Sequence, residues 1–224
     1  MTPPPSALDA EPKMRTSSTL MILVGAAMLA GGLACGATST APDIDTPETR
    51  PADGLRLLTV APDSPPLATL RASFYAVKGR NAGADLWYRA RPGRTDSTKF
   101  VEFRMGGASL DRRPDGSPVA AGDSVLITLT VVDPLHLVID FQPSGLVFSA
   151  ADRPKLKMFF GSVGDDLNRD GVVNTDDDAI RNSLSIWRQE GLSQPWFKLA
   201  TARISESREV DADLLGFTGY AMAY

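Results

Sequence analysis

The feature that most constrains the fold is a strict alternation of apolar and polar residues in the middle of the chain. Ile127, Leu129 and Val131 alternate with threonines, and a similar pattern covers residues 135–142. Successive side chains of a β-strand point to opposite faces, so this period of two predicts strands with one buried face. We expect further strands at residues 55–60, 72–78, 85–89, 100–105, 155–160, 196–204, 210–214 and 220–224.

Turns rich in Gly and Pro separate these segments, for example at residues 91–94, 113–116 and 142–145. Many short strands without alternating long helices predict an all-β fold, a β-sandwich formed by residues 54–224. Residues 178–187 are ambiguous. Ile180, Leu184 and Trp187 have helical spacing, whereas residues 184–188 also alternate like a strand. We expect a short helical turn followed by a strand.

One loop has the spacing of a calcium site. Residues 166–177 read Asp-Leu-Asn-Arg-Asp-Gly-Val-Val-Asn-Thr-Asp-Asp. Ca²⁺ prefers six to eight oxygen ligands, and a tight loop presents alternate residues to one centre. The glycine at the sixth position permits the sharp turn. The expected ligands are the side chains or carbonyls of Asp166, Asn168, Asp170, Val172, Asn174 and Asp177. The alternative is a polar surface turn that binds nothing.

This loop resembles the calcium loop of dockerins, which also ends in Asp instead of the Glu of an ordinary EF-hand. Dockerins carry two such repeats and bind cohesins, but this chain has a single Asp-x-Asn-x-Asp-Gly segment. A further 47 residues follow Asp177, and they read as strands. We therefore expect an inserted loop within the sandwich, with a cohesin-docking module as the alternative.

The second half of the sandwich resembles the module of ankyrins and netrin receptors. The resemblance rests on residues 143–149, 154–160, 196–199, 210–212 and 217–221. It implies a structural or protein-binding role. Some members of that family cut themselves at a His-Phe-Ser segment. The matching residues here are Gly216, Phe217 and Thr218, without the histidine, so self-cleavage is not expected.

The N-terminal region predicts export. Residues 20–34 are apolar or small, the length of a signal-peptide core, and Cys35 follows as the only cysteine. Residues 32–35 resemble a bacterial lipobox, which implies a signal peptide at 1–34 and a lipid anchor on Cys35. The alternative is a buried cysteine in a core helix. Acidic and Pro-rich residues 1–13 do not suit a signal peptide, so we expect translation to start at Met14.

Residues 35–53 predict a flexible tether that follows the anchor. They are rich in Ala, Thr and Pro and have little apolar surface with which to offset the entropy of ordering. Gly36 directly after the cysteine resembles lipoproteins of the outer membrane, if the cell has two membranes. The expected location is thus the cell envelope, with the folded domain held off a membrane.

No catalytic motif stands out, and we do not expect an enzyme. His136 is the only histidine, so there is no second imidazole for a zinc site. Glu102 and Asp140 are among the carboxylates that a glycoside hydrolase would pair, but sequence does not place them together. Trp87, Trp187 and Trp196 suit a sandwich core better than a sugar platform. With 23 basic and 27 acidic residues, nucleic-acid binding is not expected.

These features together predict a lipid-anchored surface protein with a β-sandwich and structural calcium, which binds a protein or polysaccharide or serves a structural role. The alternatives are a docking module for a cohesin-type partner and a carbohydrate-active enzyme or sugar-binding module.

Overall fold

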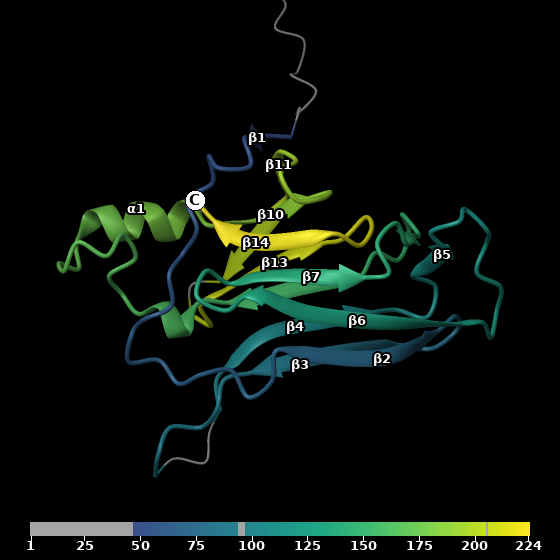
Figure 1. Ribbon diagram of the computed structural model, residues 1–224, viewed down its shortest axis with the longest axis horizontal. Coiled ribbons are helices and arrows are strands. Elements are labelled where there is room, and N and C mark those ends of the chain that lie inside the picture. Colours follow the sequence, from purple (N-terminus) through teal and green to yellow (C-terminus); the bar gives the residue numbers. More distant parts are fainter. Residues whose placement is uncertain (1–46, 94–96, 205) are drawn as a thin grey trace, which may run out of the picture. The chain divides into compact units, whose positions relative to one another are not determined.

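The alternating segments form antiparallel strands, as their period predicts. The computed structural model describes residues 47–93, 97–204 and 206–224. All described elements lie in one unit, Ile44–Tyr224, which is a sandwich of a seven-stranded and a five-stranded sheet with one short α-helix among the described residues (Figure 1). The predicted all-β sandwich is confirmed.

The seven-stranded sheet begins at one edge with a two-residue strand and ends at β2. In spatial order its strands are β1 (Thr49–Arg50), β11 (Trp196–Lys198), β10 (Ser185–Gln189), β14 (Gly219–Ala223), β7 (Val138–Gln142), β6 (Ser124–Asp133) and β2 (Arg71–Val77). Chain order differs from spatial order, so the sheet is completed only by the C-terminal strand β14.

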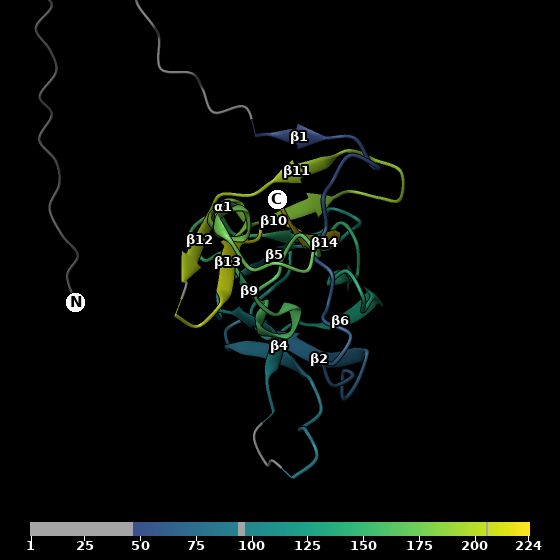
Figure 2. The ribbon, with the colours of Figure 1, turned by 90° about the vertical axis from the view of Figure 1, so that its left-hand side faces the viewer.

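The five-stranded sheet forms the second layer (Figure 2). In spatial order its strands are β12 (Thr201–Ile204), β13 (Glu209–Asp213), β9 (Lys155–Phe159), β4 (Lys99–Met105) and β3 (Ala82–Trp87). A small ribbon pairs β5 (Leu110–Arg112) with β8 (Val147–Phe148). Strands β2 and β3 follow each other in the chain but belong to different sheets, so they join the two layers at one edge.

Aromatic rings fill the space between the sheets. Phe141 and Phe217 stack with ring centroids 4.7 Å apart, and Phe103 and Phe148 lie 5.7 and 4.8 Å from the ring of Phe217. Phe141, Phe103 and Phe217 are almost completely buried. Such rings bury large apolar areas and gain further from edge and offset contacts. This cluster therefore fixes how the two sheets pack.

A second, smaller cluster lies apart from the main core. Trp187 and Trp196 are buried there, with Leu55 and Leu57 packed against them. Trp87 is partly exposed. The expectation that the tryptophans fill the sandwich core is therefore wrong in detail. Two of them belong to a separate cluster, which the chain before β2 covers.

Three strand predictions need correction. Residues 55–60 form no regular strand, and a single bridge joins Leu57 to Ala223. Residues 196–204 form two strands, β11 and β12, which belong to different sheets. Residues 135–137 belong to the turn before β7, in which Leu137 has a φ of 58°. The local apolar pattern therefore does not determine where a strand begins and ends or which strand it pairs with.

The predicted tether is too long at its C-terminal end. Strand β1 pairs with β11, and Lys198 bonds the side chain of Glu48 at 2.8 Å. The indole nitrogen of Trp196 donates to the carbonyl oxygen of Ala52. Residues 47–53 therefore belong to the sandwich and not to a tether.

The expected helix is present as α1 (Thr175–Ser183), but it begins inside the candidate calcium loop and not after it, and the expected strand that follows is β10. The signal peptide at 1–34, the start at Met14, the anchor at Cys35 and tether residues 35–46 lie outside the described residues. No helix within the described part of the chain is long and apolar enough to cross a membrane.

Candidate metal centre

The loop at residues 166–177 connects the two sheets. Before it lie β9 of the five-stranded sheet and the short 3-10 helix η1 (Gly161–Val163), and after it come α1 and then β10 of the seven-stranded sheet. Figure 1 shows this green segment beside α1, at one end of the sandwich. The loop therefore lies inside the domain's connectivity, as the sequence predicts, and is not an appended module.

The first half of the loop is a series of tight turns. An oxygen of Asp166 accepts a hydrogen bond of 3.0 Å from the backbone nitrogen of Gly171. The Asn168 side chain accepts from the backbone of Asp170 at 3.0 Å, and Asp170 accepts from the backbone of Val172 at 2.9 Å. Gly171 has a φ of 87°, a conformation that glycine adopts at little cost. These bonds bring the predicted ligands into one short loop.

The second half begins the helix. Asn174 is the N-cap of α1, and its side chain accepts a hydrogen bond of 2.7 Å from the backbone of Asp176. Asp177 completes a capping box by accepting from the backbone of Asn174 at 2.9 Å. Two orphan backbone donors of the helix are thereby satisfied. The expected ligands at the ninth and twelfth positions thus also start the helix.

Asp177 is the most buried acidic residue of the loop, with 0% of its surface exposed. Its other oxygen accepts from the backbone nitrogen of Leu167 at 2.6 Å and from that of Asn168. The bond from Asn174, together with those from Leu167 and Asn168, lowers the pKa of Asp177 against the opposing effect of burial. The carboxylate is therefore held in its charged form and closes the loop onto its own beginning.

One oxygen of an expected ligand has no hydrogen-bond partner. The second oxygen of Asp166 is buried and makes no hydrogen bond within the described residues. A buried carboxylate oxygen without a partner is costly, and a cation is the group that it accepts best. Across residues 47–93, 97–204 and 206–224, however, no three His, Cys, Asp or Glu side chains converge in a metal-holding arrangement. Backbone amides bond to both oxygens of Asp177, to the other oxygen of Asp166 and to one oxygen of Asp170, whose second oxygen accepts from the side-chain amide of Asn168 at 2.9 Å.

A basic side chain inside this acidic loop ties it to the sandwich. Arg169 donates to the carbonyl oxygens of Val163, at 2.7 Å, and of Thr59. Its φ is 64°, which turns the chain between two expected ligands. No role is predicted for Arg169 from the sequence. The available signal was its charge, which is the only positive one within residues 166–177.

The acidic residues that flank the loop form ion pairs with arginine side chains. Arg181 lies 3.8 Å from Asp165 and 2.5 Å from Asp178, and Arg208 also contacts Asp165. Asp165 and Asp178 lie just outside the twelve-residue motif. These ion pairs therefore balance charge around the loop without using an expected ligand.

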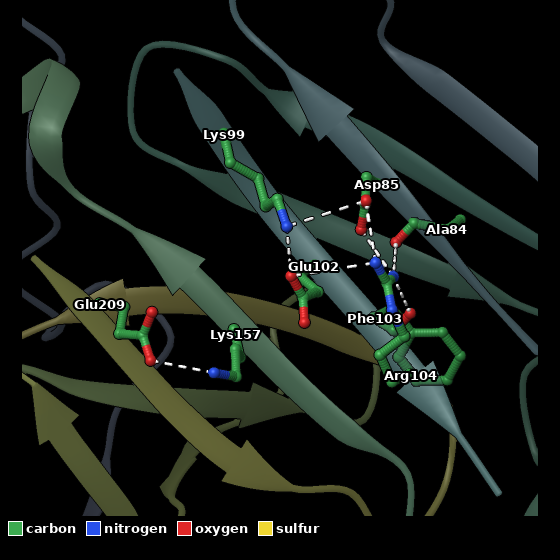
Figure 3. A network of polar contacts seen from close by, with 8 residues as sticks. All are labelled: Ala84, Asp85, Lys99, Glu102, Phe103, Arg104, Lys157 and Glu209. Carbon is green, nitrogen blue, oxygen red and sulfur yellow. Dashed lines mark hydrogen bonds and ion pairs between the residues drawn. The ribbon is translucent and has the colours of Figure 1, made fainter. Parts of the chain in front are cut away.

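The carboxylates considered for glycoside hydrolysis do not meet. Glu102, on β4, belongs to an ion-pair network with Lys99 and Arg104 on the five-stranded sheet (Figure 3). Asp140, on β7 of the seven-stranded sheet, accepts a hydrogen bond of 2.8 Å from Gln142. A hydrolytic pair needs its two carboxyl groups to flank one bond. Residues on opposite sheets of the sandwich do not provide that geometry.

His136 lies in the turn between β6 and β7. Its ring nitrogen Nδ1 is 2.8 Å from an oxygen of Asp133. The other oxygen of Asp133 accepts from the backbone nitrogens of Leu135 and His136. Asp133 therefore holds this turn together. Its contact with the His136 ring is part of the turn's own hydrogen bonding.

Comparisons with known proteins give no relative, since no protein family model, curated protein or solved structure matches this chain.

Proposed function

We propose that this chain is an exported, lipid-anchored β-sandwich protein of the cell envelope that binds one structural Ca²⁺ in the loop at residues 166–177. It acts as a binding or structural protein. The observation that carries the proposal is the buried, unpartnered oxygen of Asp166, in a loop whose remaining residues match a calcium motif in type and spacing.

A cation beside Asp166 would supply the missing partner of that oxygen. Asn168 and Asp170 belong to the same series of turns as Asp166, so their side-chain oxygens lie in the same short loop as the unpartnered oxygen. Modest side-chain rotation away from the backbone amides would add them to the coordination shell. A carboxylate oxygen has more than one lone pair. An oxygen of Asp177 can therefore accept an amide hydrogen bond and coordinate a metal ion at the same time.

The position of the loop supports a structural role for the ion. It connects two sheets, begins α1 and is tied to Thr59 and Val163 through Arg169. An ion bound only by the folded state would therefore stabilise the whole sandwich. At about 100 times the dissociation constant, this contributes about 2.7 kcal/mol.

Export and anchoring rest on the sequence of residues 1–35, with Cys35 as the lipid attachment site. Because residues 47–53 belong to the sandwich, the proposed tether shortens to residues 36–46. The anchor would hold the sandwich near a membrane surface outside the cytoplasm. Calcium sites of extracellular modules have dissociation constants of about 0.1–1 mM.

One observation favours a docking role as the second candidate. Val172 and Val173, in the calcium loop, are both exposed, at 58% and 63%. Exposed apolar side chains beside a metal site are a surface to which a protein partner of cohesin type could bind. In that case calcium would shape the docking surface as well as stabilise the fold.

Thermal unfolding of the full chain tests the structural role. We expect calcium to raise the melting temperature and EGTA to reverse the increase. Asp170→Asn should remove most of the calcium response, whereas Asp176→Asn, the same change at a position of the loop that is not a predicted ligand, should keep it. A melting temperature that calcium does not change in the wild type would contradict the proposal. If Asp170→Asn lost a partner without losing calcium-dependent stability, the docking role would replace the structural one.

A further inference from the structure

A second polar site lies at the end of the sandwich where β3 leads into β4, and it contains no predicted calcium ligand. It is a cavity of about 270 Å³, lined mainly by Tyr88, Arg89, Arg91, Thr98 and Ser162. The loop from β3 extends from this end, at the bottom of Figure 2. A single water needs only about 10–15 Å³ of such space, so the cavity is large enough for a small ligand.

Two buried hydroxyl groups belong to residues that line this cavity. Tyr88 is 2% exposed and Ser162 is 8% exposed; their hydroxyl groups are neighbours, and neither has any other hydrogen-bond partner in the described residues. Buried hydroxyl groups are nearly always hydrogen-bonded, because leaving one unpaired costs free energy. A contact between the two hydroxyl groups uses only one of their two O–H donors, so an acceptor on a ligand would complete the other.

The backbone holds both hydroxyl-bearing residues in place. The backbone nitrogen of Tyr88 donates to Thr98 at 2.9 Å, and its ring packs edge-on against Phe100. The carbonyl oxygen of Ser162 accepts from Ser64 at 2.6 Å and from the backbone of Ala61 at 2.9 Å. The hydroxyl groups are thus positioned without a ligand, which reduces the entropic cost of binding one.

The charge of the lining is positive. Arg89 and Arg91 contribute guanidinium groups, and no Asp or Glu is among the described residues that line the cavity. Asp63 approaches Arg91 only at 4.0 Å, from an exposed position. Burial raises the pKa of Tyr88, and the neighbouring Ser162 hydroxyl only partly offsets that rise. Tyr88 therefore stays protonated and can donate a hydrogen bond.

We propose that this cavity binds a tetrahedral oxyanion, a phosphate or sulfate group, through the hydroxyl groups of Tyr88 and Ser162 and the guanidinium groups of Arg89 and Arg91. Arginine matches the geometry and charge of such groups, and hydrogen bonds to an ionised acceptor are stronger than neutral ones. The oxyanion is either a free inorganic ion or the charged end of a larger molecule. The cavity volume allows both, because it exceeds the space that one water requires.

Calorimetric titration of the full chain, in buffer free of phosphate and sulfate, tests this site. The probes are inorganic phosphate, inorganic sulfate and glucose 6-phosphate, with glucose as the neutral control. Binding of the inorganic ions identifies a free ion as the ligand. Binding of glucose 6-phosphate alone identifies an esterified group. Both results support the site, provided that glucose does not bind.

Matched variants locate the binding. Tyr88→Phe removes one buried hydroxyl and should weaken binding about tenfold or more. Tyr75→Phe removes the hydroxyl of a tyrosine that is 67% exposed and should leave binding unchanged. If Tyr88→Phe does not fold by circular dichroism, Ser162→Ala takes its place with the same expectation. The proposal is overturned if no oxyanion binds, if glucose binds equally well, or if the variants at Tyr88 and Ser162 bind like the wild type.

Discussion

Arg169 donates a hydrogen bond of 2.7 Å to the carbonyl oxygen of Val163, and this contact joins the middle of the candidate calcium loop to η1. The same guanidinium group reaches Thr59, on the segment that precedes β2. A single side chain thus links the loop to two other parts of the sandwich. Val163 is buried, so its carbonyl has few alternatives for hydrogen bonding.

Replacing Arg169 with alanine should therefore destabilise the domain. Hydrogen bonds from a charged donor contribute about 1.5–3 kcal/mol, and we expect a loss of that order in urea unfolding. Arg56→Ala is the control, because Arg56 is exposed and should change stability by less than about 0.5 kcal/mol. Equal midpoints for the two variants would show that the contacts of Arg169 do not stabilise the loop.

The start of α1 can be tested apart from the metal. Asn174→Ala removes the N-cap and should cost about 1 kcal/mol in EGTA, where only capping contributes. In saturating calcium the loss should be larger, since the same side chain is an expected ligand. Asn182→Ala, at an exposed position of the same helix, should change little in either condition. An identical loss with and without calcium would remove Asn174 from the ligand set.

Acid should weaken the loop through Asp177. Backbone hydrogen bonds from Asn174, Leu167 and Asn168 lower its pKa from the ordinary value of 3.8. A carboxyl whose pKa is lower in the folded state stabilises that state above its unfolded pKa, and this stabilisation disappears as pH falls through the folded pKa. Below about pH 4, melting temperature should therefore decline more steeply in the wild type than in Asp177→Asn.

Asp176→Asn serves as the control for this pH series, because it removes a neighbouring carboxylate in the first turn of the same helix. It should keep the slope of the wild type. Parallel slopes for all three proteins would mean that Asp177 does not contribute to acid unfolding.

The aromatic cluster should set the stability of the sandwich. Phe217 contacts rings from both sheets and from β8, at centroid distances of 4.7 Å to Phe141, 5.7 Å to Phe103 and 4.8 Å to Phe148. Phe217→Ala removes these contacts and leaves a cavity, for which we expect a loss of about 3–5 kcal/mol in urea unfolding.

Tyr75→Ala is the matched surface change, since Tyr75 lies exposed on β2. It should cost no more than about 1 kcal/mol. A small effect of Phe217→Ala, comparable to this control, would mean that the two sheets repack freely around the missing ring.

Sequence predicts the strands well where both the alternation and the partner strand are present. Residues 127–131 fall within β6, and the predicted strand at 210–214 corresponds to β13, which runs one residue earlier, from Glu209 to Asp213. Residues 55–60 are mostly apolar but form no strand, because their side chains pack against the main core and the tryptophan cluster while the backbone bonds mainly to loops and strand ends. An alternating pattern predicts that one face of a segment is buried. It does not predict which strand, if any, the segment will hydrogen-bond with.

The break within residues 196–204 shows a second limit. Trp196 and Phe197 pair with β10, whereas Thr201 and Ala202 pair with β13 in the other sheet. Which sheet a segment joins depends on contacts far away in sequence, and the local pattern is the same in both cases.

The two candidate sites differ in the same way. The candidate calcium loop is contiguous, so its expected ligands can be predicted from spacing alone. The oxyanion cavity brings together Tyr88 and Ser162, which are distant in sequence and carry no motif. Their two buried hydroxyl groups become neighbours only once the fold places them on one wall.

Calorimetric titration of calcium into the metal-free full chain tests the central claim most directly. The account predicts one bound Ca²⁺ per chain, loss of binding in Asp170→Asn and binding like that of the wild type in Asp176→Asn. Absence of binding to the wild type, or equal binding by the two variants, would contradict it.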